Sequence, residues 1–437
     1  MSRKPIIAAI DLGTDKCVTL VATFNEETGK PQVVGVSAVK SRGMKKSAIV
    51  NLEEVSATLT ESLDGAERMA GLSISEAYIS VSGSHIKSQN SKGVVAVANP
   101  NQEINHEDVE RVIEAARAVS LPNDRQIIHV VPRDFKVDSQ TGIKDPVGMT
   151  GIRLESEAHI ITGLSTSLKN IRKSISDLGV ELNGFVFSGL ASAITSASET
   201  EKELGVAVVD IGSGSTSVCV FVEGALEYST SLPIGARHIT QDIALGCRIS
   251  LDSAEAVKLM LSGNGQEILT PKPGESKEDL NKRRKEADKI DLEKLDLDEE
   301  GTKELSKKSV IEGIMVPRIK EIFTLIGKDL EKKNLLPLIP AGLVITGGGA
   351  ETVSIVDVAK KTMRLPARIG RPKEMEGITS DINRPTFATS IGLIEYAISQ
   401  GAISQSKSSF AFGSLFKGIK LGGIGEKVKG LFKSLIP

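Results

Sequence analysis

"AIDLGTDK" (residues 9–16) and "VVDIGSGSTS" (residues 208–217) are two versions of one short pattern, and together they decide the fold. In each, an apolar run ends in an aspartate, and a turn of glycine and small hydroxyl residues leads into another apolar run. Strand, tight turn and strand form the signature of a β-hairpin. Because the pattern occurs twice, far apart in the chain, the sequence predicts a duplicated α/β unit and not a single sheet.

A third strand and several helices are predicted around these hairpins. The strand is "AGLVIT" (residues 341–346), which runs into "GGGA" and then into a helical pattern over residues 352–363. Another helix is predicted over residues 105–118, where Asn105 is placed to cap the first turn, and a further one over residues 167–178. This order of strands and helices is typical of mixed α/β halves.

The turns of the two hairpins have the composition of a phosphate site. A turn can hold phosphate only where no side chain projects into the anion, so glycine and small hydroxyl residues suit it, as Gly13 with Thr14 and residues 212–216 do. Asp11 and Asp210 end the strands just before the turns, where a carboxylate can hold a hydrated Mg²⁺. Two facing hairpins therefore predict a clamp around one polyphosphate.

Other nucleotide-binding motifs fit poorly. The chain has no GxxxxGK[ST] sequence, and "GSGSTS" (residues 212–217) lacks the third glycine of the dinucleotide fingerprint and lies in a hairpin instead of a strand-to-helix turn. P-loop and Rossmann chemistry are therefore disfavoured.

The order DxGT, DxGxGxT and TGGG resembles the actin, Hsp70 and sugar-kinase ATPase superfamily. This resemblance implies two phosphate loops, an adenosine loop, and ATP with Mg²⁺ as the ligand, the metal being held through water by Asp11 and Asp210. It also implies that Glu255 and Lys258, three residues apart in "DSAEAVK", meet the base and ribose; an ordinary surface ion pair is the alternative. The implied nucleotide-binding residues are Asp11, Gly13, Thr14, Lys16, Asp210, Gly212, Ser213, Gly214, Ser215, Thr216, Glu255, Lys258, Gly347, Gly348 and Gly349.

Residues 82–163 select one branch of this superfamily. They contain "DPVGMTGIRLE" (residues 145–155) and resemble the extra subdomain, called 1C, of the FtsA family of bacterial cell-division proteins. The resemblance covers essentially the whole chain and implies an α/β actin-like fold of two ribonuclease-H-like halves with an FtsA-type insertion. The implied division is 1A at 1–82, 1C at 83–162, 1A at 163–198, 2A at 199–245, 2B at 246–316, 2A at 317–384, a return helix at 385–399, a linker at 400–414 and a membrane-targeting tail at 415–437.

The family resemblance also implies a function. It implies head-to-tail polymerisation into filaments, peripheral attachment to the cytoplasmic face of the cell membrane at the division site, and tethering of FtsZ through its C-terminal peptide, together with contacts to other division proteins and no nucleic acid. Within the same fold, a pilus-assembly ATPase of the PilM type, a small-molecule kinase and an Hsp70-type chaperone are the alternatives. The chaperone would need a large β-rich domain after residue 396, where only about forty residues follow.

The C-terminus supports the membrane step independently. Apolar residues recur there at helical spacing beside lysines, the pattern of a helix that lies in a membrane interface. Five glycines between residues 418 and 430 weaken this helix, so we expect the tail to be disordered in solution and helical on anionic lipid. The predicted membrane residues are Phe416, Ile424, Val428, Leu431, Phe432, Leu435 and Ile436, with Lys427, Lys429 and Lys433.

Composition agrees with a protein made and kept in the cytoplasm. Net charge is −2 over 437 residues, but residues 404–437 alone carry six lysines and one glutamate. The three cysteines lie far apart, and the N-terminus leads directly into a strand, without the apolar segment of a signal peptide. Residues 276–308 hold 21 charged residues of both signs, which predicts a solvated helix and loop.

Hydrolysis of ATP is expected to be slow at most. The segment that links the halves, "FVFSGLASAITSASE" (residues 185–199), has no glutamine or carboxylate before Glu199 that could orient or deprotonate a water. Nucleotide is therefore expected to act mainly as an assembly switch.

Overall fold

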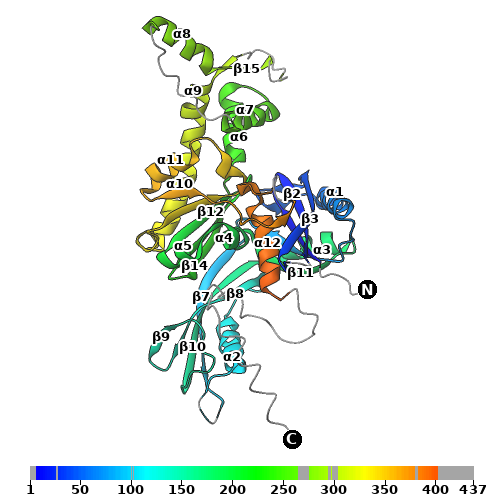
Figure 1. The fold of residues 1–437 in the computed structure, drawn as a ribbon, viewed down its shortest axis with the longest axis vertical. Coiled ribbons are helices and arrows are strands. Elements are labelled where there is room, and N and C mark those ends of the chain that lie inside the picture. Colours follow the sequence, from blue (N-terminus) through cyan, green and yellow to red (C-terminus); the bar gives the residue numbers. More distant parts are fainter. Residues whose placement is uncertain are drawn as a thin grey trace.

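Two α/β halves lie side by side, with a smaller sheet at one end and a helical extension at the other (Figure 1). The computed structural model describes residues 6–25, 28–99, 101, 103–263, 275–293, 297, 304–378 and 382–401. The predicted membrane-targeting tail lies outside these residues. Among the described residues, no helix has both the length and the apolar character needed to cross a bilayer.

The first half is built on a six-stranded sheet with the order β11-β6-β1-β2-β3-β19. Its hairpin strands β1 and β2 are antiparallel, as are β2 and β3, whereas β6 runs parallel to both β1 and β11. The bounds are β1 Ile7–Leu12, β2 Lys16–Phe24, β3 Pro31–Lys40, β6 Glu76–Val81, β11 Glu181–Phe187 and β19 Glu376–Gly377; a separate small hairpin pairs β4 Met44–Lys45 with β5 Ala48–Ile49.

The second half repeats this arrangement in the order β14-β13-β12-β17-β18. Again the first three strands of the half are antiparallel and the next two are parallel to the first. The predicted duplication is therefore confirmed strand by strand. The bounds are β12 Val206–Ile211, β13 Thr216–Val222, β14 Ala225–Leu232, β17 Gly342–Thr346 and β18 Ala367–Ile369.

Helices cover both sheets and connect them. Predicted and observed ends agree closely at α2, because the Asn105 side chain caps it in a capping box with Asp108. The helix predicted over 352–363 begins later, at Ile355, because Ser354 just before it has a left-handed conformation that a helix cannot include. The bounds are α1 Leu52–Ala70, α2 His106–Arg117, α3 Ser165–Ser176, α4 Ser188–Ser196, α5 Glu199–Leu204, α6 Arg237–Cys247, α7 Leu251–Gly263, α8 Lys277–Asp288, α9 Lys307–Val310, α10 Val316–Lys332, α11 Ile355–Met363 and α12 Ala388–Ser399.

A four-stranded sheet with its own core lies between β6 and α3 in the chain. The strand order is β7-β10-β8-β9, and α2 packs against it around Val112, Phe135 and Leu154. The bounds are β7 Lys87–Ala96, β8 Arg125–Val137, β9 Gln140–Ile143 and β10 Arg153–Leu164. In Figure 1 this sheet extends away from the two halves.

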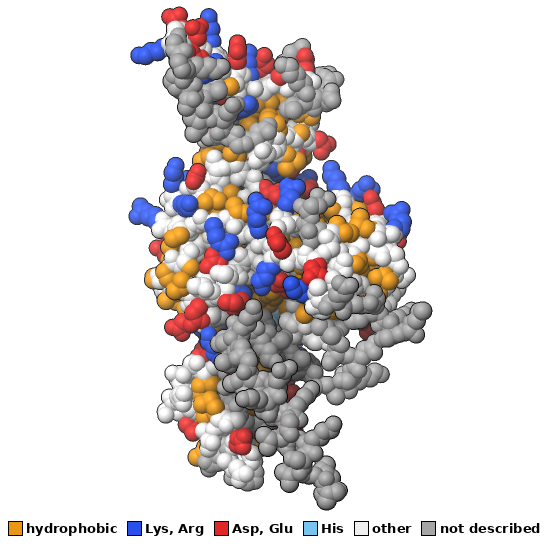
Figure 2. Space-filling model, in the orientation of Figure 1, with side chains coloured by type: hydrophobic (Ala, Val, Ile, Leu, Met, Phe, Trp, Pro, Cys, Tyr) orange, Lys and Arg blue, Asp and Glu red, His pale blue; other side chains and the backbone are white. Residues whose placement is uncertain are grey.

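The charged segment forms part of the extension at the opposite end. Helix α8 has no buried residue, and Figure 2 shows acidic and basic side chains mixed on the surface there. It is followed by the short hairpin of β15 (Lys289–Asp291) and β16 (Glu304–Ser306). The prediction of a solvated helix is confirmed for α8, whereas the predicted loop was wrong in part, because Ile290 and Leu292 after α8 are buried in the core of the second half.

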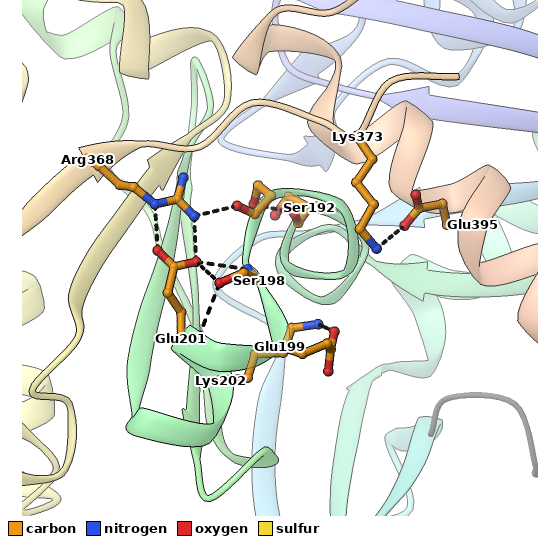
Figure 3. Close-up of polar contacts among 9 residues, drawn as sticks. Ser192, Ser198, Glu199, Glu201, Lys202, Arg368, Lys373 and Glu395 are labelled. Atoms are coloured by element: carbon orange, nitrogen blue, oxygen red, sulfur yellow. Dashed lines mark hydrogen bonds and ion pairs between the residues drawn. The ribbon is translucent and has the colours of Figure 1, made fainter. Parts of the chain in front are cut away.

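Two helices cross between the halves, α4 and α12. At their crossing a Cβ on Gly392 would lie 1.8 Å from the Ala191 carbonyl oxygen, so only glycine permits this approach. Figure 3 shows how the far end of α4 is fixed: Arg368 of β18 donates to both carboxylate oxygens of Glu201 at 2.6 Å and to the Ser196 carbonyl at 3.0 Å. This guanidinium holds the pKa of Glu201 down at about 2.

Candidate nucleotide pocket

The two hairpin turns open into one cavity of about 150 Å³ between the halves. Most of the predicted phosphate residues lie on its wall, although they come from strands of different sheets. The predicted residues found there are Asp11, Gly13, Thr14, Lys16, Asp210, Gly212, Ser213, Gly214, Ser215, Gly347 and Gly348.

The turns themselves are copies of each other. The Gly13 amide donates to the Lys16 carbonyl at 3.0 Å, and the Gly212 amide donates to the Ser215 carbonyl at 2.9 Å. Such tight turns leave backbone amides at the tip available to an anion. The turns also approach each other, because a Cβ on Gly214 would lie 2.5 Å from Thr14 Oγ1. The duplicated sequence therefore produces two hairpin turns that face each other across the cavity, called the two jaws below.

Two carboxylates face this cavity, Asp210 buried and Asp11 half-buried. Asp11 accepts a hydrogen bond from Ser80 Oγ at 2.7 Å, and Asp210 accepts one from Thr389 Oγ1 at 3.0 Å. Burial raises the pKa of Asp11. Burial, followed by repulsion from Asp11, raises the pKa of Asp210 to about 7. Two carboxylates that repel each other out of water form a site where a divalent cation relieves the repulsion.

Lys16 supplies a positive charge on the same wall. Its Nζ donates to Thr386 Oγ1 at 2.8 Å and lies 4.3 Å from the centre of the Phe387 ring. Burial lowers its pKa, and the attraction of Asp11 opposes this. The ammonium group thus bridges the first turn and the segment that leads into α12, within reach of an anion in the cavity.

Both crossing helices begin at the cavity. Ser188, the first residue of α4, and Thr389, the second residue of α12, line it, and neither helix has a side-chain cap at its N-terminus. The first amides of a helix carry partial positive charge, so both helices favour an anion here. Gly347, in the loop after β17, is a separate constraint on the cavity. It has φ +81°, and a Cβ added to it would lie 2.2 Å from Asp210 Oδ1. An alanine there would displace the carboxylate.

Four predicted residues do not lie on the cavity wall. Thr216 is buried and donates to the Ile234 carbonyl at 2.7 Å, and Gly349 packs against Ile211. Lys258 Nζ donates to Glu255 at 2.8 Å and to Thr240 at 3.0 Å, so these side chains pair with each other. The predicted membrane residues lie outside the described part of the chain.

Several wall residues were not predicted. They are mainly isolated serines and threonines: Ser47, Ser82, Ser188, Ser217, Thr386 and Thr389, with Leu12 and Asp15 from the first turn. Ser47 joins the jaws, since its amide donates to Thr14 Oγ1 at 2.9 Å and its hydroxyl lies 2.8 Å from that of Ser215. A lone serine has no sequence signature, so only the fold could reveal these residues.

Duplicated sheets, facing glycine turns and an acidic pair between them define an actin-like protein. Two family models match the chain: "SHS2 domain inserted in FTSA" at residues 83–162 and "Cell division protein FtsA" at residues 207–392. Curated proteins named cell division protein FtsA match over most of their length: 34% identity with that of Pseudomonas aeruginosa (92% of each chain) and 32% with that of Bacillus subtilis (94% of this chain, 87% of the relative). The chain belongs to the FtsA family of cell-division actin homologues.

Solved structures agree on the fold. The PilM-PilN type IV pilus biogenesis complex contains a chain similar to this one with a TM-score of 0.60 at 14% identity, covering 90% of this chain and 98% of that one. MreB 5 of Spiroplasma citri bound to AMPPNP gives a TM-score of 0.50 at 13% identity, covering 91% and 96%. At these identities the likeness concerns the fold, and the PilM alternative gains no support beyond it.

Proposed function

We propose that the chain binds ATP with Mg²⁺ in the cavity between the hairpin turns, as the nucleotide switch of an FtsA-family filament. The observation that carries this proposal is the carboxylate pair Asp11 and Asp210, whose mutual repulsion between two glycine turns fits a divalent cation with phosphate. Asp11 and Asp210 would hold the Mg²⁺ through its bound water molecules, and phosphate oxygens would complete its six-ligand shell. The metal would neutralise phosphate charge there.

The turns, one lysine and two helix ends on the wall would share the binding of the nucleotide. The turn amides after Gly13 and Gly212 would hold phosphate oxygens, Lys16 would pair with their charge, and the N-termini of α4 and α12 would add their partial positive charge. Gly347 and Gly348 would face the adenosine. Glu255 and Lys258 stay assigned to the adenosine side, because Ser262 on the same helix α7 accepts from the Val353 amide at 3.3 Å, just after the glycine loop.

Hydrolysis would be slow. Among the described residues that line the cavity there is no glutamine or glutamate, the side chains that most often orient an attacking water in this chemistry. We therefore assign nucleotide the role of stabilising one arrangement of the two halves and so of the filament contacts.

At the level of the cell, the protein would polymerise on the cytoplasmic face of the membrane and tether FtsZ filaments at the division site. Family membership supports FtsZ, other division proteins and further copies of this chain as partners. The subdomain boundaries given above belong to the same proposal; residues 83–162, matched by the insertion model, hold most of the four-stranded sheet. The basic amphipathic tail at 415–437 would provide the peripheral membrane anchor.

The anchor is tested by replacing Leu431 and Phe432 together with aspartate. Two charges in the apolar stripe should abolish co-sedimentation of the purified protein with vesicles of anionic lipid, because burial of that stripe drives interfacial binding. Substituting Gly430 by alanine is the matched control and should retain or strengthen binding, since it favours the helix by roughly 1 kcal/mol. Unchanged vesicle binding by the double aspartate variant would refute the anchor.

A further inference from the structure

A second cavity, of about 470 Å³, lies where the four-stranded sheet meets both halves. Its walls come from α2 and β8 of that sheet, from α4 and α5, from the turn between β13 and β14, and from the end of α12. It lies apart from the nucleotide pocket but shares helix α4 with it: Ser188 lines the first cavity, whereas Leu190 and Ile194 line the second.

The second cavity is suited to apolar side chains. Aliphatic residues dominate its wall, and Ile127 and Val130 of β8 face it without joining any of the hydrophobic clusters of the described chain. Its buried histidine is already satisfied: His129 Nε2 accepts from the Phe187 amide at 2.9 Å, and burial lowers the pKa of His129 to about 3. A neutral, hydrogen-bonded ring adds no charge to the cavity floor, so burial of apolar groups would be the main gain on binding.

The rim of the cavity is slightly acidic. It carries Glu110, Glu114 and Glu199, and its two cations are already paired. Arg117 pairs with Glu114 at 3.1 Å. Lys202 pairs with Glu199 at 2.8 Å, as Figure 3 shows. An apolar cavity with a rim of net negative charge fits an amphipathic segment whose polar face is basic.

The chain itself supplies such a segment next to the opening. Gln400, at the end of α12, lines the cavity, and the described chain ends at Gly401. Residues 402–437 follow, with six lysines, one glutamate and the apolar series Ile424, Val428, Leu431, Phe432 and Leu435. Twenty-two residues, 402–423, separate Gly401 from this series, and a random-coil chain of that length has a root-mean-square span of about 26 Å. A tethered ligand at this distance reaches an effective concentration in the millimolar range.

We propose that the tail, instead of staying disordered in solution as its glycines predict, docks its apolar stripe into this cavity of its own molecule. Docking and membrane binding then exclude each other, because both use the same stripe. The inference uses the tail named in the proposed function but does not depend on its binding to lipid. It makes membrane attachment a regulated step: lipid competes with the cavity for one segment. Because α4 lines both cavities, the docked tail contacts a helix that begins at the nucleotide pocket.

A single tryptophan tests this docking, because the natural sequence contains none. In the full-length purified protein with Phe432→Trp, measured without lipid, we expect indole emission shifted to the blue relative to a synthetic tail peptide with the same tryptophan. The shift should not change on serial dilution, since the contact is intramolecular. A shift that disappears on dilution would assign the cavity to a second copy, and the absence of any shift would leave it to a separate partner; either result overturns the proposal.

Two aspartate substitutions, one inside the cavity and one outside it, separate loss of docking from a general effect of added charge. Ile127→Asp should return the emission to that of the free peptide. Ile152→Asp, at a 62% exposed site just before β10 and outside the cavity, should leave the blue shift intact. If circular dichroism shows that Ile127→Asp is unfolded, the exposed Glu110→Lys replaces it and should reduce the shift. A blue shift that persists in a folded Ile127→Asp or in Glu110→Lys would overturn the proposal.

Competition with lipid gives an independent readout on the protein with Phe432 unchanged. If docking holds about nine-tenths of the tails, removing it should strengthen binding to anionic vesicles by about tenfold. Ile127→Asp should therefore bind such vesicles more tightly and Ile152→Asp should bind them as the natural chain does. Equal binding by all three would contradict the competition, whereas absence of vesicle binding in all three would refute the anchor and leave the emission test valid.

Discussion

Replacing Asp210 with asparagine should make the nucleotide-free protein more stable at pH 8 while abolishing its Mg²⁺-dependent binding of ATP. Folding buries this carboxylate beside Asp11, which raises its pKa from 3.8 to about 7. A shift of that size corresponds to roughly 4 kcal/mol of destabilisation once the group is ionised. Asparagine removes the charge and keeps an oxygen that can accept the Thr389 hydroxyl, so it removes the cost without losing the hydrogen bond.

The sign of the pH dependence follows from this shift. Below the unfolded pKa of 3.8 the carboxyl is protonated in both states and costs nothing. As pH rises from 3.8 to about 7, the folded state retains a proton that the unfolded state has lost, so the free energy of unfolding falls. Asp210→Asn should therefore match the natural protein near pH 4, exceed it increasingly up to about pH 7, and keep that advantage at pH 8.

Urea unfolding at a series of pH values, with and without Mg²⁺, measures this effect. Mg²⁺ should stabilise the natural chain at pH 8 and leave Asp210→Asn unchanged, since the metal relieves a repulsion that the variant lacks. Asp64→Asn, at an exposed site on α1, is the control and should follow the natural protein. A variant with Asp210→Asn that is less stable than the natural chain at pH 8 would show that the aspartate pair is not under electrostatic stress.

Gly392→Ala should destabilise the protein, against the trend of helix propensity. Alanine favours a helix by about 1 kcal/mol relative to glycine. At this position, however, the added Cβ would lie 1.8 Å from the Ala191 carbonyl oxygen and 2.4 Å from its carbonyl carbon. Backbone atoms cannot rotate away as a side chain can, so α4 and α12 must separate, at a cost of about 1–3 kcal/mol or more. Because both helices begin at the nucleotide pocket, affinity for ATP should fall as well.

Thermal and urea unfolding check this result, with Gly313→Ala as the control. Gly313 has no atom within 4 Å of the added Cβ, so that substitution should be neutral or stabilising. Equal stability of Gly392→Ala and Gly313→Ala would mean that α4 and α12 are not tightly packed where they cross.

The duplicated hairpins could be predicted because their signal is local. Asp11 and Asp210 each end an apolar strand before a glycine turn, and the same amide-to-carbonyl bond closes both turns. Helix α2 was predictable for a similar reason, since Asn105 and Asp108 cap it within four residues. Where the helix near residue 352 begins could not be predicted, because Ser354 adopts a left-handed conformation with φ +64° that no pattern announces.

The candidate site was predictable only in its loops. Lys16 reaches Thr386 across 370 residues of sequence, and Ser47 joins the two jaws through hydroxyl groups that have no distinctive spacing. Thr216 and Gly349 matched the motif but serve the packing of the second sheet. Motifs thus indicate where the backbone turns, whereas burial and distance in the fold decide which side chains face the cavity.

Titration calorimetry of the full-length protein with ATP, in the presence of Mg²⁺ and then of a chelator, tests the central claim most directly. We expect one ATP per chain with Mg²⁺, and affinity reduced at least tenfold when the metal is removed, because each 1.4 kcal/mol of lost interaction is a factor of ten. Absence of heat with ATP and with ADP, in protein shown by circular dichroism to be folded, would contradict the assignment of the cavity between Asp11 and Asp210 as a nucleotide site.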